Sequence, residues 1–503
     1  MSQEPENVQI EVNEDQIFAQ RIAKIEEIKK RGGNPFGQRF DGREEIATAR
    51  ERFNPELPAE TEKQPAVFAG RLMAVRLMGK SIFADLQDSS GKIQLYLGKN
   101  ALGEEKFDFF KKLVDIGDIV GTEGYMFLTR MGELTLHVED FQLLSKSLRP
   151  LPEKYHGLTN IEQRYRQRYL DLITNADSRE VFRKRFAIIR GIRKFMEAQG
   201  FMEVETPMLQ PLAGGANANP FKTFYEAIQS PMFMRIAPEL YLKRLLVGGF
   251  EKVFELNRNF RNEGVDRRHN PEFTMMEVYQ AYGDCRSMMD LVEELVTTLA
   301  MEVNGSLQVA KTDGTVIDLT RPWRRVTYRE LVEEKAGKDY FSLDFAGKLA
   351  RARELGCDVG ETTPEFEVTN EIYEKLIEQT LIQPTFVMRM PAVLVPLAKA
   401  CADDPSVVDV FELEINGQEV APGYSELNDP VEQRRRFTEQ FERTRAEGEA
   451  WDDKVDEDFL VALEHAMPPA GGMGIGIDRL VTMLTGVDSI RDVLLFPQLR
   501  GRK

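Results

Sequence analysis

Two neighbouring stretches of the chain carry the pattern that decides its fold: residues 260–263 read Phe-Arg-Asn-Glu, and residues 269–279 read His-Asn-Pro-Glu-Phe-Thr-Met-Met-Glu-Val-Tyr. A short polar loop separates them. Side chains two positions apart on a strand share a face. The arginine and glutamate of the first stretch therefore share a face, and Glu277 shares one with Tyr279. The spacing predicts strands whose faces carry charged side chains in fixed positions.

A glycine-rich segment and a basic helix frame this pair along the chain. Residues 471–480 read Gly-Gly-Met-Gly-Ile-Gly-Ile-Asp-Arg-Leu, and their glycines permit close backbone approach before a helix. Arg479 would stand where that helix begins, in a place favourable to phosphate. Upstream, a basic amphipathic helix leads through Gly200 into residues 201–207, Phe-Met-Glu-Val-Glu-Thr-Pro. The glycine fingerprints of phosphate-loop and dinucleotide-binding folds do not occur, which argues against those two folds.

The composition predicts a soluble, globular, cytoplasmic protein of two or three domains. The chain has 503 residues, 30% charged and 42% hydrophobic, with no apolar run of about 18 residues that would span a membrane. Its acidic N-terminus resembles neither a secretory signal nor a transit peptide. The net charge of −17 argues against general nucleic-acid coating, although the basic stretch 159–194 is either a local patch or a solvated helix face. The three cysteines lack zinc-ligand spacing, so free thiols are expected.

Residues 66–148 have the element order of an OB-fold barrel, which commonly binds single-stranded nucleic acid. Five candidate strands, with a helical pattern between the third and fourth, lie at 67–77, 81–88, 92–97, 119–129 and 133–144. Alternation in the second and third strands points apolar residues inward and leaves Phe83, Gln94 and Tyr96 outward. This aromatic and amide set suits stacking on bases, and ordinary packing on the strand surface is the alternative.

The rest of the chain is predicted to be a mixed α and β body. Helical patterns and short apolar strands alternate along it, with helices at 177–199, 284–303 and 431–447 and strands at 252–257, 272–280 and 407–415. Before the barrel, apolar residues at helical spacing predict an amphipathic helix over 16–31, and prolines among charges predict a linker over 52–65.

The three framing segments resemble motifs 1, 2 and 3 of the class II aminoacyl-tRNA synthetases. Three longer strings are similar to the lysine branch of bacterial type: Arg-Ile-Ala-Pro-Glu-Leu-Tyr-Leu-Lys at 235–243, the string 270–279, and Tyr-Ser-Glu-Leu-Asn-Asp at 424–429. The resemblance covers nearly the whole chain and implies an α+β protein. Its implied parts are an N-terminal helix and linker (1–65), an OB-fold anticodon-binding barrel (66–148), and a catalytic domain with an antiparallel sheet flanked by helices (149–503).

The resemblance also implies a reaction and its participants. In such enzymes lysine attacks the α-phosphorus of ATP, pyrophosphate leaves, and the 3′-hydroxyl of tRNA(Lys) captures the lysyl group. ATP, lysine and tRNA(Lys) are thus the expected partners, Mg²⁺ is the expected cofactor, and no membrane is involved. Since motif 1 lies at a two-fold interface in the family, a homodimer is also implied.

Specific residues of the nucleotide site follow from the same resemblance. Positions that match the family's ATP-binding residues are Arg261, Glu263, His269, Asn270, Phe273 and Arg479. Arg261 and Arg479 match arginines that hold the α- and γ-phosphates, and they are the expected catalytic residues. Glu412 and Glu419 match magnesium ligands. Without the resemblance, Arg261 with Glu263 would be a cross-strand ion pair, and Glu412 with Glu419 a hairpin surface.

The amino-acid and anticodon sites are carried over in the same way. The expected lysine-binding residues are Gly215, Glu239, Glu277, Tyr279 and Glu426. Glu426 and Tyr279 are assigned to the ε-ammonium, Glu277 and the Gly215 carbonyl to the α-amine, and Glu239 to either, because a desolvated ammonium needs charged or strong acceptors. The alternative is that these acids face solvent. The expected anticodon contacts are Arg76, Phe83 and Gln94.

Two departures from the family bear on the pocket, and three other functions compete. Pro422 stands where relatives carry an asparagine, and residues 386–391 read Phe-Val-Met-Arg-Met-Pro where many carry Thr-Asp-His/Tyr-Pro. An aspartyl or asparaginyl enzyme would need positive or amide groups in place of these carboxylates. A protein-lysylating relative would lack the barrel, and an inactive regulator would not need the intact set of motif residues.

Overall fold

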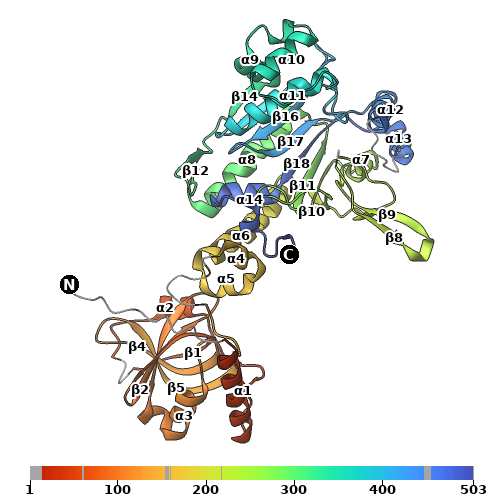
Figure 1. Ribbon diagram of the computed structural model, residues 1–503. Helices are drawn as coiled ribbons and strands as arrows, with labels where there is room; N and C mark the ends of the chain where they lie inside the picture. Colours follow the sequence, from red (N-terminus) through yellow and green to blue (C-terminus); the bar gives the residue numbers. More distant parts are fainter. Residues whose placement is uncertain are drawn as a thin grey trace, which may run out of the picture. The chain divides into compact units, whose positions relative to one another are not determined.

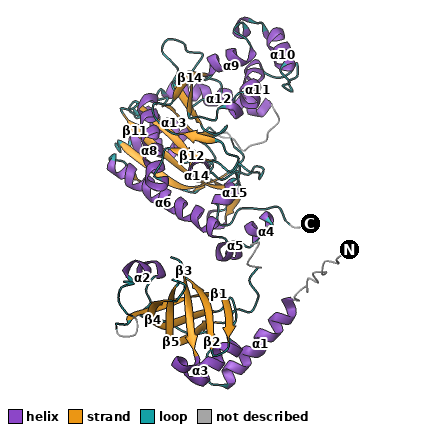
Figure 2. Cartoon of the chain, turned by 90° about the vertical axis from the view of Figure 1, so that its left-hand side faces the viewer, coloured by secondary structure: helices purple, strands orange, loops and turns teal. Residues whose placement is uncertain are grey.

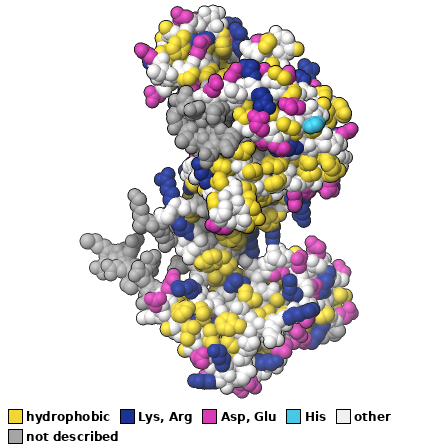
Figure 3. Space-filling view, turned by 90° about the vertical axis from the view of Figure 1, so that its right-hand side faces the viewer, with side chains coloured by type: hydrophobic (Ala, Val, Ile, Leu, Met, Phe, Trp, Pro, Cys, Tyr) yellow, Lys and Arg dark blue, Asp and Glu magenta, His cyan; other side chains and the backbone are white. Residues whose placement is uncertain are grey.

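The computed structural model describes residues 14–501 apart from 59–61, 153–157, 159, 217 and 447–454 (Figure 1). The chain divides into two compact units, Met1–Leu158 and Thr159–Lys503. No helix among the described residues is long and apolar enough to cross a membrane. On the face drawn in Figure 3, acidic and basic side chains are interspersed, so the net charge of −17 forms no single-sign patch there.

The first unit contains a closed five-stranded barrel with the strand order β1-β2-β3-β5-β4, as expected for an OB-fold (Figure 2). The strands are β1 Gln64–Met78, β2 Ser81–Gln87, β3 Lys92–Gly98, β4 Ile119–Leu128 and β5 Leu134–Ser145. The helices of this unit are α1 Glu14–Lys30, α2 Ile46–Arg52 and α3 Lys99–Leu113. Ile82, Ala84 and Leu86 are fully buried, which confirms the inward face that the alternation predicted.

A buried cluster of charged residues lies at one end of the barrel, where β4 begins and β5 ends. The ammonium of Lys146 is fully buried and lies 2.7 Å from the Asp118 carboxylate, itself fully buried, and 2.5 Å from Asp115. Asp118 also accepts the backbone N–H groups of Asp115 and Ser147. Charges removed from water are tolerated only when they are paired and hydrogen-bonded, as here.

The second unit is built on an eight-stranded sheet with the order β14-β15-β16-β17-β18-β11-β10-β6. In this order the strands are Arg324–Thr327, Thr385–Met388, Val410–Glu414, Glu419–Ser425, Ala470–Gly476, Glu272–Ala281, Lys252–Phe260 and Met202–Glu203. The expected antiparallel pairing holds in the centre, but β14 runs parallel to β15 and β6 runs parallel to β10. The sheet is therefore mixed, and the protein is α+β.

Helices cover one face of this sheet, and the other face carries charged and polar side chains. The core packs side chains of three helices, α6 Ala176–Ala198, α8 Cys285–Asn304 and α14 Ile477–Thr485, against the central strands. Figure 2 shows α6 and α8 running side by side along this face. Because strand residues alternate between faces, the residues between the core positions point away from these helices.

Smaller elements complete the second unit. The remaining helices are α4 Ile161–Arg166, α5 Arg168–Thr174, α7 Glu239–Val247, α9 Tyr328–Ala336, α10 Phe345–Glu354, α11 Glu365–Leu376, α12 Pro430–Ala446, α13 Glu457–Glu464 and α15 Ile490–Val493. The remaining strands are β7 Leu209–Gln210, β8 Lys222–Tyr225, β9 Ser230–Met234, β12 Gln308–Ala310 and β13 Val316–Asp318. All three cysteines are buried free thiols, as expected.

Replacing Lys146 with methionine should destabilise the barrel by about 3–5 kcal/mol, because Asp118 would stay buried without its cation. Lys106→Met is the matched control, since Lys106 forms an exposed pair with Asp140, and such pairs contribute about 0–1 kcal/mol. Hydrogen–deuterium exchange of β4 and β5 in the whole chain measures the loss. Equal exchange in the two variants would contradict the assignment.

Candidate functional site

The sheet face opposite the helices carries the candidate site. On β11, Met276 and Val278 enter the core, so the alternate residues Glu277 and Tyr279 point to the other face. Beside them on β18, a side chain at Gly472 would collide with Glu426 Oε1 and the Tyr279 ring. Glycine here leaves room that any other residue would fill.

Arg261 directly follows β10, and its guanidinium forms no ion pair with the described residues. Its backbone N–H donates to the Pro271 carbonyl at 2.8 Å, and its guanidinium lies 5.1 Å from the centre of the Phe273 ring. Its Nε has no hydrogen-bond partner among the described residues. Burial lowers the pKa of Arg261, against the opposing effect of Glu419 and other nearby carboxylates, but a guanidinium remains charged at any physiological pH. A cation beside an aromatic ring suits a nucleotide with its phosphate.

Arg479 brings a second cation to the same face from the first turn of α14. Its Nη1 donates to the Glu419 backbone carbonyl at 2.6 Å, and its Nη2 lies 3.3 Å from His269 Nε2. Helix N-termini favour anions, so the position suits phosphate oxygens. The structure thus joins the glycine-rich segment to the loop that follows β10.

That loop holds the other expected nucleotide residues. His269 Nδ1 lies 2.9 Å from the Asp266 carboxylate, in an exposed part of the loop. Asn270 is buried, donates to the Glu272 carbonyl at 2.6 Å and accepts the Gln498 backbone N–H at 3.2 Å. Glu263 is exposed just beyond β10. The side chain of Asn270 therefore orders the loop, while His269 and Glu263 remain accessible.

Glu412 on β16 and Glu419 on β17 lie in an acidic neighbourhood. Burial raises the pKa of Glu412 well above its ordinary value, and the negative charges of Glu419 and Glu378 add to this. No group of three or more potential ligands among the described residues is arranged to hold a metal ion. Mg²⁺ often binds only one or two carboxylates and takes its other ligands from water and phosphate, so a pair of acids fits it.

The five expected amino-acid residues lie together in one cluster, and four of them are buried. Glu239, Glu277, Tyr279 and Glu426 are all at most 5% exposed, so the solvent-facing alternative is wrong. The Tyr279 hydroxyl donates to Glu277 at 3.1 Å. Gly215 has a φ of +84°, and a side chain there would press within 3.1 Å of Glu239 Cβ. Glycine is therefore the residue that fits this position.

The sequence did not point to the cations that share this pocket. Lys243 is fully buried, with Nζ 2.7 Å from Glu239 Oε1 and 2.5 Å from Glu426 Oε2. Arg235 is buried and lies 2.6 Å from the equally buried Glu255, which is paired opposite Glu277 in the sheet. The four-residue spacing of Glu239 and Lys243 on one helix was the available signal.

The pocket is short of positive charge. Four buried carboxylates, of Glu239, Glu255, Glu277 and Glu426, face two buried cations, of Lys243 and Arg235. Burial raises the pKa of Glu277 to about 8, and the charge of Glu239 adds to the rise. Burial also raises the pKa of Glu426 to about 8, although Lys243 opposes it. At neutral pH these two acids are therefore largely protonated, and a bound ammonium group would favour their carboxylate forms.

The two departures from the family have different consequences here. Pro422 lies in β17 opposite Glu412 and adds no hydrogen-bonding side chain. In the other segment, Phe386 and Val387 are fully buried in hydrophobic cores, and Arg389 forms a 2.9 Å ion pair with Asp403. The second segment therefore serves packing.

The barrel carries an aromatic surface around the expected residues. Arg76 lies opposite Phe83 in the sheet, Phe83 lies opposite Tyr96, and the latter two rings are 5.3 Å apart. Arg76 pairs with an aspartate at 2.9 Å, and Gln94 accepts the Thr135 hydroxyl at 3.1 Å. The sequence missed His137, whose ring lies 5.2 Å from that of Tyr96.

Comparison with known proteins agrees with both units. The family described as tRNA synthetases class II (D, K and N) matches residues 160–500, and the OB-fold nucleic acid binding domain matches residues 66–144. The lysine–tRNA ligases of Syntrophomonas wolfei and Carboxydothermus hydrogenoformans are each 50% identical over 98% of this chain and cover 98% and 99% of their own lengths. That of Aquifex aeolicus is 50% identical over 92% of this chain and 76% of its own length. The chain therefore belongs to the lysine–tRNA ligase family within the class II tRNA synthetases.

Proposed function

We propose that the protein is a lysine–tRNA ligase, which converts lysine and ATP to lysyl-adenylate and pyrophosphate and then transfers the lysyl group to the 3′-hydroxyl of tRNA(Lys). The observation that carries the proposal is the charge of the buried pocket, where four carboxylates face two cations. Lysine brings two ammonium groups and one carboxylate, a net positive charge, and so reduces the excess of negative charge. Aspartate, with a net negative charge, would increase the excess, and asparagine, with no net charge, would leave it unchanged.

Within the pocket, each ammonium has a distinct set of acceptors. The Oε1 atom of Glu426 accepts no hydrogen bond from the described residues and faces Gly472 beside the Tyr279 ring, a place suited to the ε-ammonium. Glu277 and the Gly215 carbonyl are assigned to the α-amine, and Glu239 lies within reach of either. This placement leaves the substrate carboxylate toward Arg261.

The first reaction step needs position and charge more than proton transfer. The carboxylate attacks the α-phosphorus in line, and the bond to pyrophosphate breaks. Arg261 meets the charge that builds at the α-phosphate, with Phe273 against the adenine, while Arg479 and His269 hold the outer phosphates. Glu263 and Asn270 are assigned to the base and its sugar. Glu412 and Glu419 would hold Mg²⁺, which would neutralise negative charge at the phosphates.

The barrel, residues 66–148 in our division of the chain, is assigned to the anticodon. Phe83 offers a ring for stacking, and Arg76 and Gln94 offer donors and acceptors to base edges. A protein-lysylating relative would have no use for this surface. The buried free cysteines suit the reducing cytoplasm, which is the proposed location.

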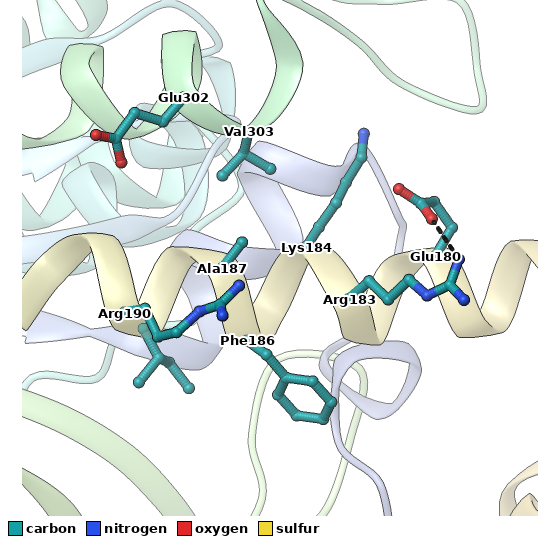
Figure 4. Close-up of a pocket in the computed structure, with 9 residues that line it drawn as sticks. Glu180, Arg183, Lys184, Phe186, Ala187, Arg190, Glu302 and Val303 are labelled. Atoms are coloured by element: carbon teal, nitrogen blue, oxygen red, sulfur yellow. Dashed lines mark ion pairs between the residues drawn. The ribbon is translucent and has the colours of Figure 1, made fainter. Parts of the chain in front are cut away.

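The helix α6 is assigned to a homodimer interface. A surface hollow beside it is lined by Phe186, Ala187 and Ile189 with charged residues at its edge (Figure 4). Phe186 is 48% exposed, although phenylalanine is among the residues most often buried. A second copy of the chain would cover this apolar surface.

The proposed function predicts that lysine alone supports strong, magnesium-dependent exchange between ATP and pyrophosphate without tRNA. The pocket gives the reason, because no other common amino acid brings two primary ammonium groups at this length. Exchange with each of the twenty amino acids measures it. If aspartate or asparagine supports the faster exchange, the proposal is wrong.

Glu426→Gln should lower kcat/KM for lysine about 10²- to 10³-fold, because it leaves buried ammonium groups without a counter-ion. The KM for ATP should move little. Glu272→Gln is a matched control on the exposed end of β11, where the side chain is 46% exposed. Lysine kinetics within a few-fold of the parent would remove Glu426 from the specificity role.

Phe83→Ala and Gln94→Ala should weaken tRNA charging and leave ATP–pyrophosphate exchange nearly unchanged, since stacking contributes about 1–3 kcal/mol per base. Met131→Ala, at a residue 94% exposed on the same barrel, is the control. Both reactions are measured on the same preparations. Parallel losses in the two reactions would mean that these residues only stabilise the fold.

A further inference from the structure

Lys243 is a fully buried cation that forms ion pairs with two carboxylates. It lies on α7, one turn after Glu239, and its Nζ lies 2.7 Å from Glu239 Oε1 and 2.5 Å from Glu426 Oε2. The same ammonium lies 5.6 Å from the centre of the Tyr424 ring. A lysine is almost never fully buried unless it is paired, and here one carboxylate from its own helix and one from a distant part of the chain pair with it.

The pairing divides the oxygens of each carboxylate. Glu426 gives Oε2 to Lys243 and keeps Oε1 toward the space beside Gly472. The hydrogen bonds that Glu239 accepts from described side chains, from Lys243 and from the Tyr424 hydroxyl at 2.6 Å, both end on Oε1. Each acid is therefore fixed through one oxygen and can offer the other to a ligand.

We propose that Lys243 is the positioning residue of the lysine pocket: it orients Glu239 and Glu426, so that one oxygen of each can meet a substrate ammonium. It acts through these acids and does not itself touch the substrate. The proposal deepens the proposed function and rests on it.

Several titratable groups surround the ammonium of Lys243. Its ammonium faces Glu239 on its own helix, Tyr424 in β17 and Glu426 just after that strand. Two further titratable groups of the cluster, Glu277 and Tyr279, lie on β11. Burial alone would lower the pKa of Lys243, but the charges of Glu239 and Glu426 raise it above its ordinary value. The ammonium stays charged, and it opposes the rise in the pKa of Glu426 that burial causes. Without it, Glu426 would hold its proton to higher pH and bind an ammonium less well.

The test compares Lys243→Met and Lys243→Arg with the parent in steady-state exchange, using the full chain, ATP and lysine over a range of pH. For Lys243→Met we expect a rise in the KM for lysine of about 10- to 100-fold, with a smaller change in kcat. The acid limb of the kcat/KM profile for lysine should move to higher pH by about one unit. The KM for ATP should stay within about two-fold.

Lys243→Arg keeps the charge and alters the geometry. Its acid limb should stay near that of the parent while the KM for lysine rises, and it keeps the test decisive if Lys243→Met does not fold. An acid limb of Lys243→Arg shifted by a full unit would overturn the proposal. Lys252→Met, on β10 and outside the pocket, is the control for removal of a partly buried lysine.

A double variant separates positioning from mere stability. If Lys243 acts through Glu426, Lys243→Met should cost much less lysine affinity in the Glu426→Gln background than alone. Unchanged lysine kinetics in Lys243→Met would overturn the proposal. So would a rise in the KM for ATP as large as the rise in the KM for lysine, accompanied by a fall in the melting temperature. Failure of the parent to use lysine at all would instead contradict the proposed function.

Discussion

The structure depends on one electrostatic constraint: carboxylates taken out of water must meet positive charge. Glu239, Glu277 and Glu426 come from α7, β11 and the end of β17, and all are buried. Each would be costly in isolation, so these elements can pack together only with cations between the acids or with protons on them. Lys243 and Arg235 supply part of that charge, and under the proposed function the ammonium groups of lysine would supply more.

The hydrophobic face of the sheet fixes the geometry of the polar face. Helices α6, α8 and α14 pack on one side, and period-two alternation then directs the intervening residues to the other. One buried contact fixes helix α14 against the sheet: Asp478 accepts the Thr274 backbone N–H at 2.8 Å and lies 2.6 Å from Arg185. Because Arg479 follows Asp478 directly, this contact also fixes the position of Arg479.

The predictability of each part follows from the range of the interactions that define it. Local alternation was enough to place Glu277 and Tyr279 on one face and to predict the barrel's inner residues, and the motif strings gave Arg261 and Arg479 by resemblance. The parallel edge strand β6 has only two residues and no local signal. Lys243 was missed because its partner Glu426 lies far along the chain, and because a lysine in a helical string is normally read as exposed.

The same constraint explains how one sheet can serve different amino acids. A pocket that selects by shape alone separates two substrates that differ by one methylene by only about 1–3 kcal/mol of binding free energy. An uncompensated buried charge costs about 3–5 kcal/mol. Selection by charge depends on how many buried lysine and arginine side chains pair with the carboxylates. Each added or lost cation changes the ligand charge that the remaining carboxylates can accept. In this chain Lys243 sets that number near Glu426, where it neutralises one oxygen and leaves the other to the substrate. Under the proposed function, specificity for a substrate with two ammonium groups would follow from the charges of the cluster, and the shape of the site would have only to set the distance between those groups.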